Sequence, residues 1–530
     1  MPDINAAERK LKLSAIFADG MVLQRGKPVT VFGVCAIPMS EVTASLRGIS
    51  AAATTGADGR FIIELPPINE YMTGLSLEVS LVGEPEESIT VSDVAVGEVW
   101  VVSGQSNAQL EVGYLEDRDE LSALADTYPM IRAFRATPAY SLAPDPIGAG
   151  RWFAVTASEA LRTDSAALSA VGYATAVALS ASLGKDVPIA IIHVARGASK
   201  IKAWLDYEGI KRLSPSETKI YEDCLASGVL PEKPHTKIAT ILYNKQIFPL
   251  TGYNVSGVIW YQGCGDVSGV SLGSEGRSYT EYFKELTALY RRTFSDERLP
   301  FFVHGLAPYL QGDLESAYRL SAFKAEQLSM CEGDEHAYLV PNMTGGGVIS
   351  DTLFSQGFLH PGRKSPLGIS TARLILSIHY GRSDCAIPYP VSAYCSGGEV
   401  TVCFKEALAL LWGEDAEGVE LYYPSLGEWV PALSYISGDK LIAKADAVHS
   451  PAAVRYAFGK PELELKDGRR VKLSNENTQR DKENKLLYIT DGDATMSFSD
   501  YTDTVSFTEC GNLALVGGVP VPVFVLELVL

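Results

Sequence analysis

The sequence has little of what marks membrane-spanning, disulfide-bonded or zinc-binding proteins. No apolar run approaches the roughly 20 residues that cross a bilayer as a helix, and the apolar residues 519–530 are too few. The eight cysteines include no Cys-x-x-Cys pair, so we expect reduced thiols and no metal. Residues 1–10 lack an apolar segment behind a basic start, which predicts a cytoplasmic protein without a secretory signal.

Positive charge is scarce as well. Lysine and arginine number 45 against 64 aspartate and glutamate residues, a net charge of −19, which repels phosphate backbones and anionic membranes. We therefore expect neither nucleic acid nor a membrane as a partner. The remaining composition is that of a globular protein, with 46% apolar and 21% charged residues, and 530 residues suffice for about three domains.

Hydrophobic patterning divides the chain into three expected domains, residues 1–95, 96–385 and 386–530. Short alternating runs in the first and last of these are typical of β-sandwiches. In the middle domain, apolar strands alternate with helical stretches, which predicts a parallel sheet with helices on both faces. The expected strands are 99–103, 187–194, 255–261 and 299–306, and the expected helices are 166–183, 279–294 and 365–380.

One expected strand runs directly into a glycine-supported serine. Residues 97–107 read Gly-Glu-Val-Trp-Val-Val-Ser-Gly-Gln-Ser-Asn, and ligands gather where the strands of a parallel sheet end. Ser106 is therefore a candidate nucleophile, with Gln105 and Asn107 beside it. An ordinary strand that leaves the core through a polar loop has the same pattern.

Three further loops follow expected strands or precede the last helix. Residues 195–199 (Ala-Arg-Gly-Ala-Ser) form a small-residue turn whose amide could face an oxyanion. Residues 262–266 combine an amide side chain, two glycines and a carboxylate, and residues 357–364 contain a histidine. A serine hydroxyl needs a base that is neutral near pH 7, although a structural histidine has the same pattern. The histidines placed at strand ends or site loops are His193, His304 and His360.

Several of these segments occur together in one known family. The chain resembles the sialate O-acetylesterases, which are SGNH hydrolases, over nearly its whole length. Residues 17–25, 93–100 and 451–457 are similar to the β-domains of the family and their junctions. The central motifs, in the family's order, are Gly104-Gln105-Ser106-Asn107, residues 242–244 (Leu-Tyr-Asn), residues 257–263 (Gly-Val-Ile-Trp-Tyr-Gln-Gly), residues 306–309 (Leu-Ala-Pro-Tyr), and His360-Pro361 with Lys364.

The resemblance implies an α/β fold, a flavodoxin-like three-layer α/β/α sandwich flanked by amino- and carboxyl-terminal β-sandwich domains. It also implies a carboxylic ester hydrolase that removes acetyl groups from sugars without a cofactor. Ser106 matches the family's nucleophile and His360 its base. Gly197 matches the glycine whose amide joins that of Ser106 in the oxyanion hole.

The chain departs from the family after Gly263. The family's Gly-Glu-Ser-Asn is replaced by Gly-Cys-Gly-Asp at residues 263–266, so the asparagine donor is absent. An ionised aspartate cannot donate a hydrogen bond, and we therefore expect Gln262 to be the third oxyanion donor. Asp266 is expected to lie against substrate, and Cys264 to be a small filler.

Two further departures concern charged residues. Arg196 replaces the tryptophan of the family's second loop, and Arg196 or Lys200 is a candidate partner for a substrate carboxylate such as that of a sialic acid; a solvated surface cation is the alternative. No aspartate lies just before His360. Asp351 is the nearest upstream candidate for the acid that orients the imidazole, Asp266 is another, and a backbone carbonyl would also serve.

The sequence thus predicts a carbohydrate O-acetylesterase of the sialate type, whose partner is a small acetylated sugar. The same chemistry on acetylated xylo- or manno-oligosaccharides is the first alternative, because substrate choice depends on loop side chains. A homologue that binds sugar without catalysis is the second, since the loop at 263–266 is altered. An exposed β-sandwich edge would allow a homodimer without requiring one.

Overall fold

The computed structural model describes most of the chain, and its residues form two compact units. The first unit comprises Met1–Gly113 and Arg118–Phe301, and the second comprises Tyr114–Asp117 and Phe302–Leu530. The described residues are 9–269, 272–308, 315–342, 344–347, 360–385, 389–410, 413–445, 448–459, 462–465, 470–472, 478–480, 486–491, 494–497, 504–508, 513–515, 521–522 and 524–529.

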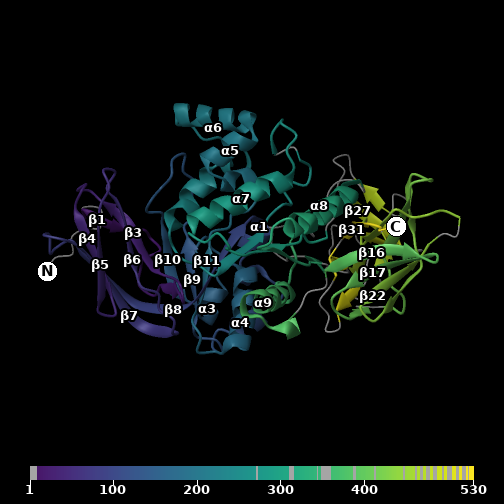
Figure 1. Cartoon of the computed structure of the whole chain (residues 1–530), viewed down its shortest axis with the longest axis horizontal. Coiled ribbons are helices and arrows are strands. Elements are labelled where there is room, and N and C mark those ends of the chain that lie inside the picture. Colours follow the sequence, from purple (N-terminus) through teal and green to yellow (C-terminus); the bar gives the residue numbers. More distant parts are fainter. Residues whose placement is uncertain are drawn as a thin grey trace. The chain divides into compact units, whose positions relative to one another are not determined.

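The first unit begins with two sheets of short strands, most of them antiparallel (Figure 1). Strict alternation explains them: β6 (Arg60–Leu65) alternates exposed and buried residues along its whole length, as a strand with one face on the core does. One sheet has the order β1-β3-β6, and the other joins β5, β4, β7 and β8, with β2 beside β8. The remaining bounds are β1 Leu11–Leu13, β2 Val22–Gln24, β3 Val29–Cys35, β4 Glu41–Leu46, β5 Ile49–Thr54, β7 Met72–Leu81 and β8 Ser88–Gly104.

Strand β8 connects this region to the central sheet without a linker. Its first half pairs with β7 in antiparallel fashion. Its second half pairs in parallel with β11 and β12, with Val102 opposite His193 and Gly104 opposite Tyr261. The expected domain boundary at residues 95 and 96 therefore falls inside one continuous strand.

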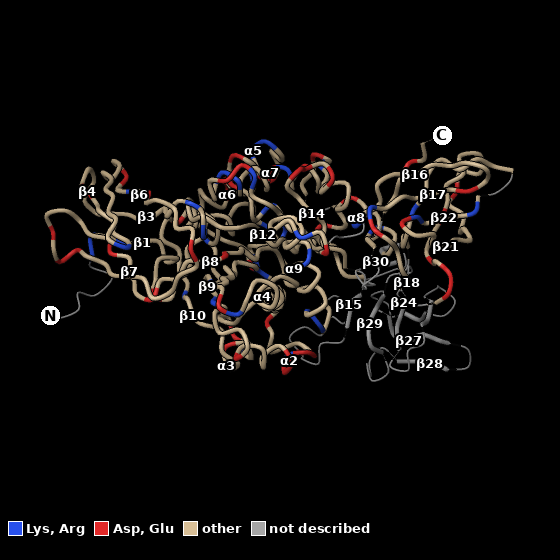
Figure 2. The backbone as a smooth tube through the Cα atoms, turned by 60° about the horizontal axis from the view of Figure 1, so that its bottom comes forward, with Lys and Arg blue, Asp and Glu red and all other residues tan. Residues whose placement is uncertain are grey.

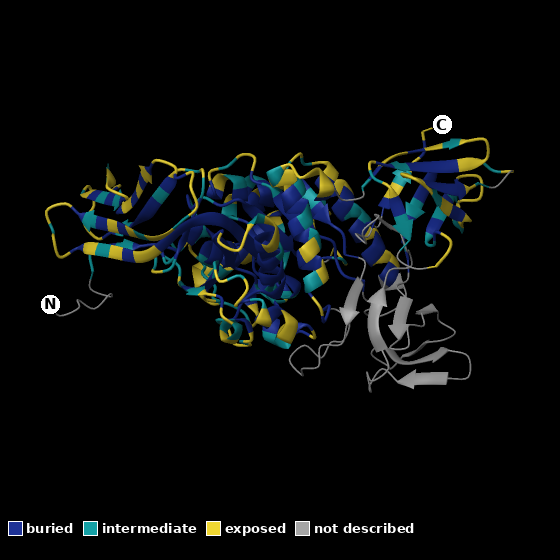
Figure 3. Ribbon diagram, turned by 90° about the horizontal axis from the view of Figure 1, so that it is seen from below, coloured by how far each residue is buried: buried dark blue, intermediate teal, exposed yellow. Residues whose placement is uncertain are grey.

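The central sheet of the first unit has the order β10-β9-β11-β8-β12, and the three pairings among β9, β11, β8 and β12 are parallel. Strands β11 and β12 are buried at every residue, because a parallel strand is covered on both faces. Figure 3 shows buried residues in dark blue. The bounds are β9 Ile131–Ala136, β10 Gly150–Ala154, β11 Ile189–His193 and β12 Gly257–Tyr261.

Helices connect these strands. Helix α4 begins at the capping residue Ser169 and is buried along most of its length, and α7 begins with a capping box of Ser278 and Glu281. The outer helices α5 and α6 carry side chains of both charges (Figure 2). The bounds are α1 Ser106–Gln109, α2 Arg118–Ala123, α3 Ala157–Ala160, α4 Ala170–Leu183, α5 Tyr207–Leu213, α6 Pro215–Ser227 and α7 Tyr279–Thr293.

Strand β13 spans Phe301–His304, and all of it except Phe301 belongs to the second unit. This unit also contains β14 (Ala337–Val340) and the helices α8 (Glu315–Glu332) and α9 (Ser365–Tyr380). Antiparallel sheets follow, including β16-β17-β22-β21 and β20-β19-β23-β31. The bounds of these strands are β16 Pro390–Ser396, β17 Glu399–Phe404, β19 Val419–Tyr423, β20 Glu428–Pro431, β21 Ser434–Ser437, β22 Lys440–Lys444, β23 Ala453–Tyr456 and β31 Phe524–Glu527.

The shorter strands of the second unit are β15 Thr344–Gly347, β18 Leu408–Leu410, β24 Glu462–Leu465, β25 Arg470–Lys472, β26 Thr478–Arg480, β27 Leu486–Asp491, β28 Ala494–Ser497, β29 Thr504–Thr508 and β30 Leu513–Leu515. The mixed α/β class expected from the sequence is confirmed. The three domain boundaries stay predictions.

Candidate active site

The turn after β8 presents Ser106 and hides Ser103. Gly104 has a φ of +131°, and a methyl group there would lie 2.2 Å from the Tyr261 carbonyl oxygen, so glycine is required. Ser103 is fully buried in the strand, whereas Ser106 is partly exposed at the start of α1. The turn thus exposes only the second serine.

Gly197 lies beside Ser106, as the oxyanion prediction requires. A methyl group added at Gly197 would lie 3.7 Å from Ser106 Cβ. The backbone N–H of Gly197 donates to Gln109 Oε1 over 2.6 Å. This contact involves a residue that the sequence gave no reason to select, because Gln109 reaches Gly197 only once β8 and β11 lie side by side.

The loop after β12 is anchored by side chains that were predicted to bind substrate. Gln105, which is buried, accepts hydrogen bonds from the backbone N–H groups of Gly263 (3.0 Å) and Gly265 (3.3 Å). Asp266, also buried, accepts from the backbone N–H of Ile201 over 3.1 Å. Both side chains therefore fix the shape of the loops around Ser106.

The side-chain amide of Gln262 forms its hydrogen bonds with other groups of the protein. It is buried, it donates to the Ser199 carbonyl oxygen (3.2 Å) and to Asp266 Oδ2, and it accepts from the Tyr279 hydroxyl (2.7 Å). A primary amide has two hydrogens, so in this arrangement Gln262 has none left for an oxyanion. Its predicted donor role has no support in this geometry. Asn107, next to the nucleophile, is fully buried too.

Arg196 is held beside Gly197 by an aromatic ring. Its guanidinium donates to the Tyr140 hydroxyl (2.8 Å) and lies 5.5 Å from the centre of that ring. Tyr140 in turn stacks on His235 and pairs with its Nδ1 at 3.0 Å. Burial, followed by the charges of Arg196 and Lys233, lowers the pKa of His235 to about 4.

Arg196 is in no ion pair with a described carboxylate. It instead lowers the pKa of the buried Arg135 by charge repulsion, after the larger effect of burial. Lys200, the other candidate cation, donates to the Gly265 carbonyl oxygen. Arg196 is therefore the better placed of the two for an anionic ligand.

His360 belongs to the second unit, and its loop is anchored by the short segment Tyr114–Asp117 of the same unit. The Glu116 backbone N–H donates to the Gly362 carbonyl oxygen over 2.8 Å. Burial and then the charge of Lys364, itself fully buried, lower the pKa of His360 to about 4. The imidazole is therefore neutral at pH 7, as a general base must be.

The other two candidate histidines are buried inside strands. His304 is fully buried, with its Nε2 2.9 Å from the Thr371 hydroxyl, and burial, followed by Lys364, lowers its pKa to about 3. Burial and the charge of Arg135 hold the pKa of His193 well below its usual value. Asp351 lies outside the described residues. The pairing of Ser106 with His360 and the identity of the orienting acid stay predictions.

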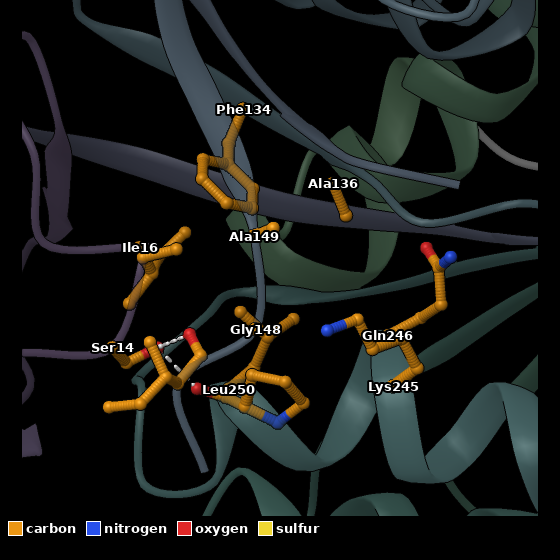
Figure 4. Close-up of a pocket in the computed structure, with 12 residues that line it drawn as sticks. Ser14, Ile16, Phe134, Ala136, Gly148, Ala149, Lys245, Gln246 and Leu250 are labelled. Carbon is orange, nitrogen blue, oxygen red and sulfur yellow. Dashed lines mark hydrogen bonds between the residues drawn. The ribbon is translucent and has the colours of Figure 1, made fainter. Parts of the chain in front are cut away.

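A small pocket elsewhere in the first unit is no candidate for a sugar. Figure 4 shows Ser14 and Ile16 opposite Lys245 and Gln246. Its free volume of about 10 Å³ is room for one water molecule. In the part of the chain that the structure describes, no cluster of three metal-ligating side chains occurs and no helix is long and apolar enough to cross a membrane. The described cysteines form no disulfide.

Comparisons with known proteins show what this chain is similar to. Residues 96–337 match the family described as carbohydrate esterase, sialic acid-specific acetylesterase. The sialate O-acetylesterase of Homo sapiens is 23% identical over 393 residues, which cover 70% of this chain and 72% of that protein. The enzyme of the same name from Mus musculus is 25% identical over 414 residues, covering 70% and 74%.

A solved structure is similar over almost the entire chain. It is a carbohydrate acetylesterase from Xanthomonas citri, with a TM-score of 0.71 and 25% sequence identity, and the match covers 97% of this chain and 99% of that one. Its agreement in fold, together with the sequence matches, confirms the resemblance seen in the motifs around Ser106. The chain is thus similar to sialate O-acetylesterases over 70% of its length, and its residues 96–337 match the sialic acid-specific acetylesterase family of carbohydrate esterases.

Proposed function

We propose that this protein is a carbohydrate O-acetylesterase that uses Ser106 as its nucleophile. The observation that carries the proposal is the placement of the Gly197 amide next to a partly exposed serine at the end of a central strand. Such an amide stabilises the negative charge that develops on the carbonyl oxygen during acyl transfer.

The proposed reaction has two halves. Ser106 Oγ attacks the acetyl carbonyl carbon while its proton passes to His360; the ester C–O bond then breaks, and the sugar oxygen takes that proton. Water next attacks the acetyl-enzyme and gives its proton to His360. Acetate leaves, and the proton returns to Ser106 Oγ.

The family's architecture belongs to the same proposal. We infer an SGNH sandwich over residues 96–385 with β-sandwich domains on either side, supported by the parallel order of β9, β11, β8 and β12 and by the antiparallel sheets near both ends of the chain. A cytoplasmic location and a homodimer are further proposals, and both rest on the sequence alone.

For the substrate we propose an acetylated sugar that carries a carboxylate, of the sialic acid type. Arg196 favours it, because this cation lies beside Gly197 and has no acidic partner among the described residues. An unneutralised guanidinium gains a charge-assisted hydrogen bond from a carboxylate and little from a neutral xylo- or manno-oligosaccharide.

One assay tests the chemistry. Wild-type protein should hydrolyse p-nitrophenyl acetate, and Ser106→Ala should lose at least about a thousandfold in kcat/KM. Equal rates for the two proteins would refute the nucleophile. A wild-type protein without turnover that still binds acetylated sugar would favour the non-catalytic homologue.

A second assay tests the substrate. Arg196→Met should raise KM for an acetylated sialic acid about tenfold, the loss of one charge-assisted hydrogen bond, and should leave p-nitrophenyl acetate turnover within twofold. Faster turnover of acetylated xylo- or manno-oligosaccharides by both proteins would favour the neutral substrates instead.

A further inference from the structure

The amide predicted to bind the oxyanion is already occupied by a side chain of the protein. The Gly197 N–H donates to Gln109 Oε1 over 2.6 Å, and a backbone N–H has a single hydrogen to donate. A methyl group at Gly197 would lie 3.3 Å from the same oxygen and 3.7 Å from Ser106 Cβ. Gln109 Oε1 and Ser106 therefore flank the same side of Gly197.

Glu111 determines which end of the Gln109 amide faces Gly197. Gln109 Nε2 donates to Glu111 Oε1 over 3.3 Å, which leaves the oxygen directed at the Gly197 N–H. Glu111 itself is buried, and its backbone bridges to Ser169, so it is a fixed anchor. Gln109 itself is only partly buried.

The turn that carries Gly197 includes a residue in an unfavourable backbone conformation. Its next residue, Ala198, has a φ of 59°, a left-handed conformation that alanine rarely adopts. The Arg196 backbone N–H donates to the Gly104 carbonyl oxygen, and the bond from Gly197 to Gln109 adds a second tie to the nucleophile loop. An acceptor at this point keeps the amide aimed at the site when no substrate is bound.

We propose that Gln109 is a resident stand-in for the substrate, a positioning residue whose side-chain oxygen takes the place of the acetyl carbonyl oxygen in the resting enzyme. Binding of an acetyl ester exchanges one oxygen for the other on the Gly197 N–H. The resting state thus competes with the substrate, and the affinity for substrate is reduced by the fraction of enzyme in which the amide is occupied. This inference rests on the proposed function.

Two substitutions, Gln109→Met and Gln109→Ala, test the proposal that Gln109 occupies the Gly197 N–H. Methionine keeps the approximate volume of the side chain but lacks the oxygen. Both should raise kcat/KM for p-nitrophenyl acetate, by up to about tenfold, the equilibrium constant that corresponds to one ordinary hydrogen bond. A phenylboronic acid, which forms a tetrahedral adduct with a serine hydroxyl, should bind both variants more tightly by the same factor. Thermal unfolding checks that each variant is folded.

A purely structural role for Gln109 gives the opposite result. If Gln109 only braced the turn, both variants would lose kcat/KM and affinity for the boronic acid together, and the proposal would be overturned. One measurement does not depend on catalysis. With 15N-glycine labelling, the Gly197 amide proton should exchange with solvent faster in Gln109→Met than in wild type. Unchanged exchange would also contradict the proposal.

The two proposals fail in different ways. A wild-type protein that turns over no acetyl ester would refute the proposed function, while the amide exchange would still report whether Gln109 occupies Gly197. An active wild type with slower Gln109 variants would refute the stand-in alone.

Discussion

The loop that carries Ser106 and the loop that carries His360 are stabilised by different kinds of interaction. Around Ser106 the anchors are neutral amides: Gln105 accepts two backbone hydrogen bonds from the loop after β12, and Gln109 accepts one from the turn after β11. The acceptors in these three hydrogen bonds are uncharged, and the carboxylates of Asp266 and Glu111 support the same loops from behind.

Around His360 the anchors are charged. The carboxylate of Asp117 accepts hydrogen bonds from the backbone N–H (3.2 Å) and the hydroxyl of Ser365, at the start of α9. The buried cation Lys364 acts on the imidazole itself. The difference suggests a division of tasks, in which one loop fixes atoms in space and the other adjusts the pKa of a base.

The largest expected effect is that of removing the main amide anchor of the Ser106 loop. Gln105→Leu leaves two backbone N–H groups without their acceptor, which should lower the free energy of unfolding by about 2 kcal/mol or more and kcat/KM by more than about tenfold. Urea unfolding and p-nitrophenyl acetate kinetics measure the two effects. The control Gln105→Glu retains a side-chain oxygen, and an equally large loss in that variant would speak against hydrogen bonding as the cause.

Removing the carboxylate anchor of the other loop should cost less. Asp117→Ala removes the acceptor at the first turn of α9, an interaction worth about 1 kcal/mol in comparable helix caps, and the loop of His360 should loosen. We expect kcat to fall several-fold with KM nearly unchanged. Asp117→Asn, which keeps one oxygen, is the matched variant. A loss confined to KM would place Asp117 in substrate binding and contradict the comparison.

A smaller effect, limited to acidic pH, is expected for Lys364→Met. A base must be neutral to accept a proton, so a His360 pKa of about 4 allows activity to persist until the pH falls toward 4. Without the cation, the pKa should rise toward its ordinary value near 6.5, and the acid limb of the kcat/KM profile should move upward. The profile between pH 4 and 8 tests this, and an unmoved acid limb would show that Lys364 does not act on the base.

The smallest effect concerns the serine that the turn hides. Ser103→Ala removes one long hydrogen-bond contact of 3.4 Å to the Tyr290 hydroxyl in the core. Stability should change by less than about 1 kcal/mol and kcat/KM by less than twofold. Loss of activity in Ser103→Ala, with activity retained in Ser106→Ala, would reverse the assignment of the nucleophile.

Much of the central region could be predicted from sequence, because its signals are local. The expected strands at 187–194 and 255–261 contain β11 and β12, and the expected helix at 365–380 coincides with α9. Apolar runs of strand length and amphipathic runs of helix length separate these elements without knowledge of their partners. The edge strand β10 and its neighbour β9 were missed, because their arginine-containing sequences lack a continuous apolar run.

What the sequence determined by itself is the resemblance to carbohydrate esterases and the choice of Ser106 as a candidate, because the apolar strand, Gly104 and Ser106 are neighbours in the chain. Only the tertiary structure decided what surrounds that serine. Gln109 accepts a hydrogen bond from Gly197, 88 residues away in the chain, and Gln262 donates its hydrogen bonds to Ser199 and Asp266. A side-chain amide donates and accepts equally well in any of these places, so which partner it takes depends on the packing of the loops and not on its own residue type.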